Sequence, residues 1–464
     1  MLSLMKNLIL NTDSYKASHY LQYPEKTETI FSYIESRGGI FPETVFFGLQ
    51  ILLKEYLVHP ITLEMIEEAA EFWEQHGEPF HQDGWLSLLQ KYNGYLPIRI
   101  RAVPEGSVIP TQNVLVTIEN TDPEFYWLPQ YLETLLLRGV WYPTTVASQS
   151  YVIKKIIYDY LTQTAEHPAE LLPFKLHDFG ARGVSSFESA GIGGVAHLVN
   201  FRGSDTVTGI LTAKKYYGCP MAAVSVPASE HAVITVWGQS HEAEAYEHIL
   251  KQFSKRGQIV SVVSDSYDIF NAVEHIYGEK LKEKIVNSGV SLVIRPDSGD
   301  PVMIVSRLLE ILAEKFGYTT NSKGYKVLNQ VRILQGDGIN RHRIHEILEA
   351  TTALSFSAEN LIFGIGGVML QQVHRDTLSF AMKVSAAKVN GIWREVYKTP
   401  LTDPNKNSKR GRLTLVREQG QYKTVQIPYE NTGAVPNDVL RTVFENGKIT
   451  KEYHFDEIRQ RASF

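Results

Sequence analysis

The sequence predicts an α/β protein, because short apolar runs that end in polar or glycine-rich loops alternate with segments of helical spacing. The runs are 174–176, 222–226, 259–263, 293–294, 331–334 and 361–363. A helical segment follows the fourth run, with apolar residues at Ile304, Leu308 and Leu312. Strands that alternate with helices form parallel sheets, and functional side chains collect at the C-terminal ends of their strands in barrels and open sheets alike.

Both ends of the chain have a different pattern, typical of half-buried antiparallel strands. Apolar and polar residues alternate in three segments, 27–35, 98–103 and 114–118. Residues 45–92 have helical spacing. Near the C-terminus, residues 443–450 predict a hairpin, because Asn446-Gly447 accepts positive φ at both turn positions.

These patterns predict two domains. We expect a β-rich domain built from residues 1–150 and 386–464, and an α/β domain of residues 151–385 inserted between its halves. The polar and basic segment 398–412, which contains Pro400, Pro404 and Gly411, is expected to be a solvated loop.

Composition limits the function classes. The 464 residues include 46 basic and 51 acidic side chains, so the net charge of −5 gives no general case for nucleic acid or for an anionic membrane as partner. The one cysteine, Cys219, allows no intrachain disulfide, which fits a reducing, cytoplasmic location. The apolar start, Met1 to Leu10, is short and indicates a first core segment, and no window has the length of a membrane span.

The loop after the fourth run carries the most chemistry. Arg295 offers a planar set of donors for phosphate, and Gly299 allows backbone amides close to an anion. The carboxylates of Asp297 and Asp300 can hold a divalent cation or sugar hydroxyls. Taken alone, the loop is equally explained as a strand-end turn, since Asp, Ser and Gly favour turns.

Several motifs together resemble the nicotinate/nicotinamide phosphoribosyltransferase superfamily over nearly the whole chain. They are Thr12-Asp13-Ser14-Tyr15-Lys16, His177 to Gly183, Ser225-Val226-Pro227 with Glu230-His231, the Asp297 loop, Gln335-Gly336-Asp337-Gly338 and Asp403-Pro404-Asn405-Lys406. The resemblance implies the irregular α/β barrel of the type II phosphoribosyltransferases. It also implies a reaction between nicotinamide and 5-phosphoribosyl 1-pyrophosphate, with Mg²⁺ as cofactor and ATP as an optional co-substrate; no metal ligand is assigned.

The resemblance assigns the ring-binding residues. Phe179 matches the aromatic that stacks on the pyridine, and Tyr15 matches an aromatic facing it from the other subunit. Asp205 matches the carboxylate that accepts a hydrogen bond from the carboxamide, and it would repel nicotinate. Without the resemblance, Phe179 would be explained as core packing and Asp205 as a helix N-cap, which is compatible with the binding role.

The resemblance also assigns phosphate and sugar contacts. Arg182 and Arg295 match ligand-contacting arginines, and Asp297 matches the acid near the ribose. The remaining substrate contacts are expected from Ser225, Ser264, Gly336, Asp337, Gly366 and Gly367. His231 matches a histidine that is phosphorylated from ATP, with Glu230 and Asp268 as expected partners of its second nitrogen.

The same resemblance implies a homodimer with shared active sites. Basic residues expected to reach phosphates across its interface are Arg375, Lys383 and Lys398, with Asp13 and Tyr15 also crossing. The chain departs from the family pattern near several of these groups. Ala381 stands where serine is frequent, Ala181 stands where an aromatic is frequent, and Ile365 and Val368 replace smaller residues beside Gly366 and Gly367. These departures put substrate affinity and ATP dependence in question.

Three other functions fit parts of the sequence. A nicotinate phosphoribosyltransferase shares the loops, and Asp205 argues against it. A non-catalytic nucleotide-binding protein would not need a phosphorylatable His231. A barrel enzyme for another phosphosugar would not need the aromatic pair and Asp205, which favour a flat ring bearing an amide.

Overall fold

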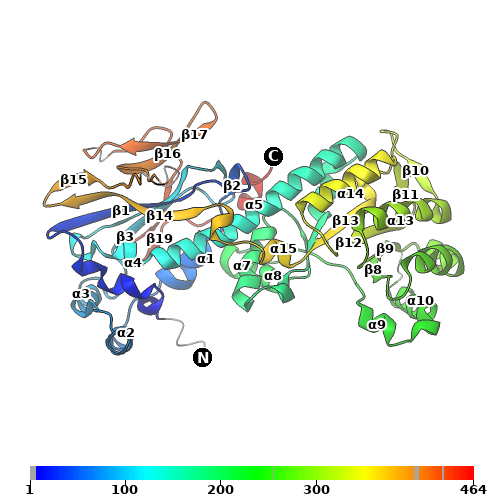
Figure 1. Ribbon diagram of the computed structural model, residues 1–464, viewed down its shortest axis with the longest axis horizontal. Helices are drawn as coiled ribbons and strands as arrows, with labels where there is room; N and C mark the ends of the chain where they lie inside the picture. The colour runs from blue at the N-terminus through cyan, green and yellow to red at the C-terminus, as the bar shows by residue number, and fades with distance from the viewer. Residues whose placement is uncertain (1–6, 254, 256, 401, 403–406, 431–432) are drawn as a thin grey trace. The chain divides into compact units, whose positions relative to one another are not determined.

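The computed structural model describes residues 7–464 except 254, 256, 401, 403–406 and 431–432, and the chain forms two compact units (Figure 1). The terminal unit contains the chain up to Ser148 together with Lys215–Cys219 and His374–Phe464. The central unit contains Gln149–Lys214 and Pro220–Val373.

A seven-stranded antiparallel sheet is the frame of the terminal unit, in the order β15-β14-β1-β5-β3-β18-β19. Its strands are β1 (Thr27–Ser36), β3 (Ile98–Ala102), β5 (Val114–Asn120), β14 (Phe380–Val389), β15 (Ile392–Glu395), β18 (Arg441–Glu445) and β19 (Lys448–Ile449). The three predicted strands and the hairpin are confirmed, with φ of 50° at Asn446 and 81° at Gly447. Because β14 pairs with β1 along its whole length, residues 380–385 lie in this unit and not in the central one, where the sequence placed them.

Helices of the terminal unit occupy the predicted helical region. They are α1 (Leu49–Leu52), the π-helical η4 (Leu53–Leu57), α2 (Leu63–His76) and α3 (Gln82–Tyr92). The side chain of Thr62 caps α2 by accepting from Met65 N, and Gly77 ends it at φ 85°. Helices α2 and α3 bury Trp73 and Trp85, which explains their apolar spacing.

A second set of elements completes this unit. Leu8–Leu10 (η2) and Ser14–Leu21 (η3) are 3₁₀ helices; β2 (Glu43–Val45) pairs with β4 (Val108–Pro110), and β16 (Arg412–Glu418) pairs with β17 (Gln421–Ile427). Leu8 and Ile9 are buried, as expected for a first core segment. Helix α5 (Glu133–Thr164) begins in this unit and ends in the central one.

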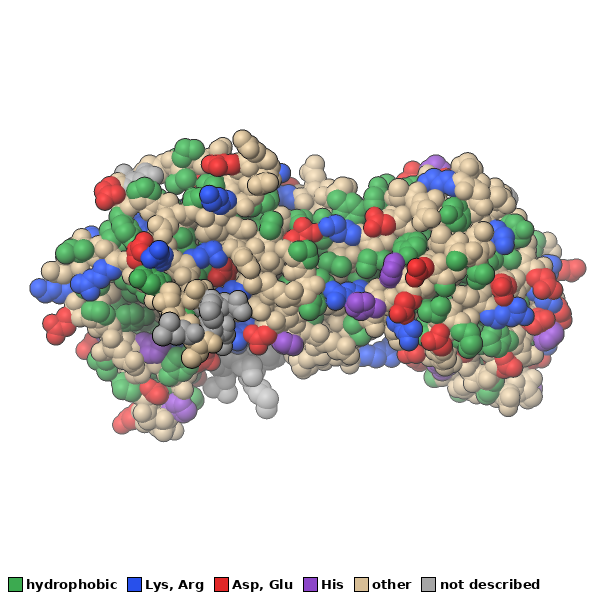
Figure 2. Space-filling model, turned by 45° about the horizontal axis from the view of Figure 1, so that its top comes forward, with side chains coloured by type: hydrophobic (Ala, Val, Ile, Leu, Met, Phe, Trp, Pro, Cys, Tyr) green, Lys and Arg blue, Asp and Glu red, His purple; other side chains and the backbone are tan. Residues whose placement is uncertain are grey.

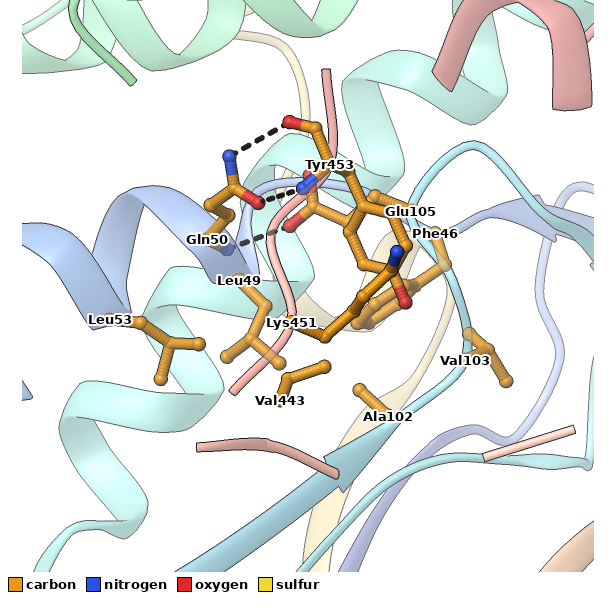
Figure 3. Close-up of a pocket in the computed structure, with 10 residues that line it drawn as sticks. All are labelled: Phe46, Leu49, Gln50, Leu53, Ala102, Val103, Glu105, Val443, Lys451 and Tyr453. Atoms are coloured by element: carbon orange, nitrogen blue, oxygen red, sulfur yellow. Dashed lines mark hydrogen bonds between the residues drawn. The ribbon is translucent and has the colours of Figure 1, made fainter. Parts of the chain in front are cut away.

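A small pocket in the terminal unit shows how its distant segments are joined (Figure 3). Gln50 N donates to the buried Glu105 carboxylate at 2.7 Å, and Tyr217 OH donates to it at 2.8 Å. Burial raises the pKa of Glu105 to about 7. The amide of Gln50 also pairs with both backbone groups of Tyr453. These polar contacts have partners within the unit, so they connect the sheet to the C-terminal segment and indicate a structural role.

The central unit is built on a six-stranded parallel sheet, in the order β7-β6-β13-β12-β9-β8. Its strands are β6 (Leu176–Asp178), β7 (Gly203–Ser204), β8 (Ile259–Val263), β9 (Ser291–Arg295), β12 (Val331–Gln335) and β13 (Leu361–Ile365). The predicted α/β class is confirmed, and five of the six predicted runs form strands of this sheet.

The remaining run, 222–226, forms no regular strand and instead closes the sheet. Val224 bridges Gly203 on one edge, and Ala228 bridges Ser261 on the other edge. Val224 N donates to Arg202 O at 2.9 Å, and Ser261 N donates to Pro227 O at 2.9 Å. We call residues 224–229 the closing segment. Its irregular pairing makes the sheet an irregular barrel.

Helices surround the barrel strands along the chain. They are α7 (Phe187–His197), α8 (Val207–Tyr217), α9 (His231–Thr235), α10 (Glu242–Phe253), η9 (Ala272–Lys280), α12 (Lys282–Ser288), α13 (Pro301–Phe316), α14 (Arg341–Ala353) and α15 (Gly367–Leu370). Helix α13 confirms the predicted helix; Asp300 caps it, Pro301 begins it and Gly317 follows it at φ 74°.

Charged side chains of both signs are interspersed on the face drawn in Figure 2, without a large area of one sign. Such a surface agrees with the small net charge of −5. Among the helices in the described part of the chain, none is long and apolar enough to cross a membrane.

Candidate active site

Loops at the C-terminal ends of the central strands bring most of the predicted site residues to one end of the barrel. The strand ends carry Phe179 and Arg182 after β6, Asp205 after β7, Asp265 after β8, Arg295 and Asp297 at β9, Gly336 and Asp337 after β12, and Gly366 and Gly367 after β13. The closing segment leads directly to His231. Parallel strands place all of these loops on the same side, which is where ligands bind in such folds.

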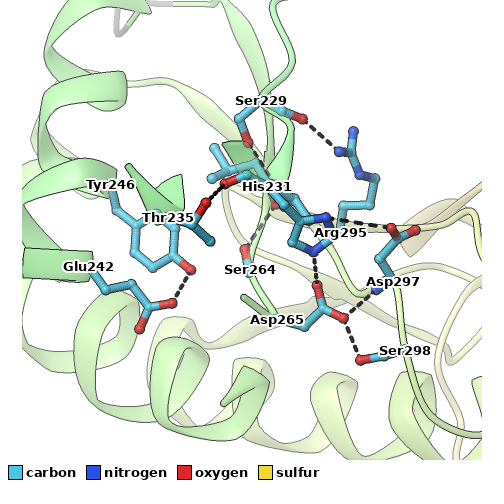
Figure 4. Close-up of polar contacts among 12 residues, drawn as sticks. Ser229, His231, Thr235, Glu242, Tyr246, Ser264, Asp265, Arg295, Asp297 and Ser298 are labelled. Carbon is cyan, nitrogen blue, oxygen red and sulfur yellow. Dashed lines mark hydrogen bonds and ion pairs between the residues drawn. The ribbon is translucent and has the colours of Figure 1, made fainter. Parts of the chain in front are cut away.

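His231 lies between two carboxylates, at the first residue of α9 (Figure 4). Its Nε2 is 3.0 Å from Asp265 Oδ1, and its Nδ1 is 3.9 Å from Asp297 Oδ2. The imidazole is 44% exposed, whereas the side chain of Asp265 is only 5% exposed. The ring is therefore held from inside the protein at Nε2, and nearly half of the imidazole is open to a reactant.

Asp265 is the partner of His231 that the residue assignments missed. Its second oxygen, Oδ2, accepts from Asp297 N at 3.0 Å and from Ser298 Oγ at 2.5 Å. Burial alone would raise the pKa of Asp265, but the hydrogen bonds from Ser298, His231 and Asp297 N outweigh it, and the net pKa is lowered. The carboxylate is thus ionised and orients the imidazole.

Arg295 is half-buried among acidic groups at the end of β9. Its Nη2 donates to Ser229 O at 2.6 Å. Burial lowers the pKa of Arg295, while Asp297, Asp205 and Asp265 raise it and Arg182 lowers it further. Burial likewise raises the pKa of Asp297, against the opposing effect of Arg295. A guanidinium in this position presents a fixed positive charge to an anion.

Phe179 lies over Gly364 of β13 and Gly336, which directly follows β12. A Cβ added at Gly364 would be 2.2 Å from Phe179 Cε2, and one added at Gly336 would be 3.6 Å away. Phe179 N donates to Ile365 O at 2.8 Å, which fixes the backbone beneath the ring. The ring is half-buried, so one part contacts the protein and the rest is available to a flat ligand.

Asp205 is held beside the ring of Phe179. Its backbone N donates to Asp178 O at 2.9 Å, one residue before Phe179, and its Oδ1 accepts from Ser225 Oγ at 2.5 Å. Both side chains are exposed. Ser225 belongs to the closing segment, so closure of the barrel positions the carboxylate. In the part of the chain that the structure describes, the Asp205 side chain makes no hydrogen bond to the start of α8, so the alternative role as a helix N-cap is not seen.

Glycine loops offer backbone amides to an anion at β12 and β13. A Cβ at Gly366 would meet no atom within 4 Å, so the space above this loop is open. Gly183 and Gly367 approach closely, since a Cβ at Gly183 would be 3.3 Å from Gly367 Cα. Gln335 Nε2 donates to Asp337 O at 2.9 Å and braces the other loop.

Three predicted site residues have other places in the structure. Ser264 is fully buried, donates to Val262 O and contacts Tyr277 OH at 3.1 Å, so its hydroxyl does not face the site. Asp268 caps a helix by accepting from Phe270 N and Asn271 N. Glu230 precedes α9, but its exposed side chain makes no capping bond there and does not replace Asp265 as the partner of His231.

The other predicted residues lie in the terminal unit, where several cations gather. Burial lowers the pKa of Lys383, Glu133 raises it, and Arg37, Lys398 and Lys16 lower it further.

Two predicted side chains beside this group are exposed. Tyr15 packs on His19 with ring centroids 5.1 Å apart, and Asp13 Oδ2 accepts from Thr134 Oγ1 at 2.7 Å. Arg375 pairs with its neighbour Asp376 at 3.1 Å. The predicted motif 403–406 lies outside the described residues.

Two family models match this chain. The nicotinate phosphoribosyltransferase (NAPRTase) family matches residues 174–448, and the N-terminal domain of nicotinamide phosphoribosyltransferase matches residues 7–100. Two curated relatives are each called nicotinamide phosphoribosyltransferase. The protein from Xanthomonas campestris is 53% identical, with 99% of this chain and 98% of the relative covered. The protein from Acinetobacter baylyi is 33% identical, with 97% and 96% covered.

Solved structures share the fold at low identity. Nicotinate-nucleotide pyrophosphorylase from Pyrococcus furiosus is similar at a TM-score of 0.62 and 16% identity, covering 99% of this chain and 95% of that one. Human nicotinic acid phosphoribosyltransferase is similar at a TM-score of 0.57 and 17% identity, covering 97% and 92%.

Proposed function

The chain belongs to the nicotinate phosphoribosyltransferase family, and we propose that it joins nicotinamide to 5-phosphoribosyl 1-pyrophosphate, giving nicotinamide mononucleotide and pyrophosphate in NAD biosynthesis. Nicotinamide is chosen as the substrate because the carboxylate of Asp205 lies beside the ring of Phe179. An ionised carboxylate accepts a hydrogen bond from a carboxamide and repels the carboxylate of nicotinate. The relatives named above support the same substrate.

The reaction needs no general base. The pyridine nitrogen attacks C1 of the sugar with its lone pair while the bond from C1 to the pyrophosphate oxygen breaks, and that electron pair leaves with pyrophosphate. Arg295, Arg182 and the glycine-loop amides stabilise the leaving charge. The carboxylate of Asp297 lies beside Arg295 and favours the positive charge that develops on the ribose.

We propose that ATP drives the reaction through His231. Asp265 holds Nε2–H, which leaves the lone pair on Nδ1 free. Nδ1 attacks the γ-phosphorus, the bond to the ADP oxygen breaks and ADP leaves; water later hydrolyses the phosphohistidine to inorganic phosphate. The added negative charge lies next to the sugar-pyrophosphate site and can change its affinity.

Mg²⁺ is proposed as the cofactor, arriving with the substrate phosphates. Within the described ranges, no group of three or more His, Cys, Asp or Glu side chains could hold a metal ion. Mg²⁺ commonly binds through substrate phosphates and water with only one or two protein carboxylates, so the residues present fit a metal–pyrophosphate complex better than a resident ion.

We propose a homodimer in which Asp13, Tyr15, Arg375, Lys383 and Lys398 of one subunit complete the site of the other. An exposed apolar pair on α8 supports association: Val207 and Leu211 lie one helical turn apart and are 61% and 52% exposed. Adjacent exposed apolar side chains of this size are typical of interfaces. We also propose a cytoplasmic location, because a chain whose single cysteine is Cys219 forms no intrachain disulfide and therefore fits a reducing compartment.

The first test is product analysis. The protein is incubated with 5-phosphoribosyl 1-pyrophosphate and either nicotinamide or nicotinate, with and without ATP, and the mononucleotides are separated by chromatography. Nicotinamide mononucleotide is the expected product. Formation of nicotinate mononucleotide alone would instead support the nicotinate enzyme, and formation of neither would reject the function.

His231→Ala is expected to abolish ATP stimulation and to leave the slow basal reaction within about threefold, because the basal step uses Arg295 and the loops, which stay in place. Wild type should take up label from γ-labelled ATP in an acid-labile, base-stable form. His241→Ala, at an exposed histidine ten residues away, is the control and should keep both properties. Retained labelling in the His231 variant would exclude this residue as the acceptor.

Gly364→Ala is expected to raise KM for nicotinamide about tenfold or more, because the new methyl group would be 2.2 Å from the Phe179 ring and must displace it. Gly336→Ala is the matched comparison, since its methyl group would make an ordinary 3.6 Å contact with the same ring. The KM of both variants is measured with the thermal midpoint of unfolding. Equal KM values would show that Phe179 does not define the ring site.

A further inference from the structure

Ser229 is bonded to the protein through each of its three polar groups, at the end of the closing segment (Figure 4). Its backbone N donates to Ser261 O at 3.0 Å. Its Oγ accepts from Val263 N at 2.9 Å, and its carbonyl accepts from Arg295 Nη2 at 2.6 Å. Ser229 is buried, with 8% exposure, so water has little access to these hydrogen bonds.

These bonds close a ring of contacts around the histidine. His231 is two residues beyond Ser229, and Asp265 is two residues beyond Val263. The loop of contacts is completed by the imidazole Nε2 and Asp265 Oδ1, which are 3.0 Å apart. The hydroxyl of Ser229 therefore fixes the distance between the two backbone segments that carry this pair.

The same residue also reaches the third loop of the site. The guanidinium of Arg295 bonds the Ser229 carbonyl, and Arg295 O accepts from Ser264 N at 3.1 Å. Movement of this guanidinium toward or away from an anion would pull on the backbone immediately before His231. No other residue of the closing segment has hydrogen bonds to both β8 and β9 in the part of the chain that the structure describes.

We propose that Ser229 is a positioning residue that couples anion binding at Arg295 to the orientation of His231 against Asp265. The proposal rests on the proposed function and deepens it, because it identifies how occupancy of the pyrophosphate site is communicated to the phosphorylated histidine. The hydroxyl is the critical atom. Alanine would keep both backbone bonds but leave the buried Val263 N–H without its acceptor, and the two segments would lose their fixed spacing.

Ser261→Ala is a matched control for Ser229→Ala. Ser261 lies on the neighbouring strand β8 and is also buried, but its hydroxyl has no hydrogen-bond partner among the described residues. Both changes remove one buried hydroxyl. Ser229→Thr restores an acceptor oxygen at the tested position. Thermal midpoints of all three variants report general loss of stability.

Ser229→Ala is expected to lower the ATP-stimulated rate relative to the basal rate about fivefold, while KM for nicotinamide stays within about twofold. Ser261→Ala should keep the wild-type ratio, and Ser229→Thr should recover most of it. A purely structural role would lower both rates together. If Ser229→Ala and Ser261→Ala have the same ratio, the proposal is overturned.

Hydrogen exchange by mass spectrometry tests the coupling without turnover. In wild type and Ser261→Ala, saturating inorganic pyrophosphate is expected to slow amide exchange in residues 229–232 and 263–266. In Ser229→Ala, pyrophosphate should still slow exchange near Arg295 but no longer in residues 229–232. Wild-type protection without turnover would reject the proposed function and retain the coupling. Equal protection of residues 229–232 in both alanine variants, or no protection in wild type, would overturn the coupling.

Discussion

Asp205→Asn is expected to lower kcat/KM for nicotinamide by about 10- to 100-fold, because a hydrogen bond to a charged acceptor contributes about 1.5–3 kcal/mol. The same change should raise the use of nicotinate, since the repulsive charge is removed and an amide can donate to a carboxylate. The ratio of kcat/KM for nicotinamide to kcat/KM for nicotinate would therefore fall, because the first value decreases and the second increases. The measurement is kcat/KM for the two substrates at fixed 5-phosphoribosyl 1-pyrophosphate.

Ser225→Ala separates the charge of Asp205 from its orientation. Ser225 Oγ donates to Asp205 Oδ1, so removing the hydroxyl leaves the carboxylate in place but less restrained. We expect a smaller loss with nicotinamide, of about two- to tenfold, and no gain with nicotinate. If the wild-type protein turns over both substrates equally, Asp205 does not set the selectivity.

The sequence predicts five of the six strands of the barrel, because their apolar runs are short and end in glycine or polar loops. The two-residue strand β7 has no apolar run, and the run 222–226 forms no strand. Residues 222–226 have the composition of a strand, yet Val224 pairs on one edge of the sheet and Ala228 on the other. A segment that joins two edges cannot keep a regular register with either of them, and composition does not reveal this.

The partner of His231 could not be chosen from the sequence for a similar reason. Glu230 and Asp268 are acids near expected helix starts, as Asp265 is, and only the curl of the sheet decides which one meets the imidazole. One signal was available. Successive side chains at a strand end point in opposite directions, so Ser264 and Asp265 could not both face the site. The buried Ser264 and the site-facing Asp265 follow that rule.

The site residues in the terminal unit were predicted only through resemblance. Tyr15 and Lys383 are far apart in the chain and belong to a 3₁₀ helix and to β14. Pattern and composition describe each as an ordinary surface or sheet residue. The role proposed for them depends on association with a second chain, and periodicity contains no information about such an association.

Mixed dimers of Tyr15→Ala and Asp205→Ala are expected to regain about a quarter of the wild-type activity, although each variant alone is nearly inactive. The reason is the proposed sharing of sites between two subunits. Tyr15 lies in the terminal unit and Asp205 in the central unit. In a mixed dimer, one site collects both changes and the other collects neither. Random pairing makes about half of the dimers mixed, each with one intact site.

The experiment requires co-expression of the two variants with different affinity tags, so that mixed dimers can be isolated. Purified mixed dimers should then have about half of the wild-type activity per dimer. A pair of changes within one unit, Phe179→Ala with Asp205→Ala, is the control. Both residues belong to the central unit, so each site of a mixed dimer keeps one change and no activity should return. Mixed dimers of the first pair that stay inactive would show that each chain builds its own site. Recovery in both pairs would show that the variants exchange subunits or retain activity of their own. Recovery in the first pair alone supports a site that Tyr15 of the second subunit completes.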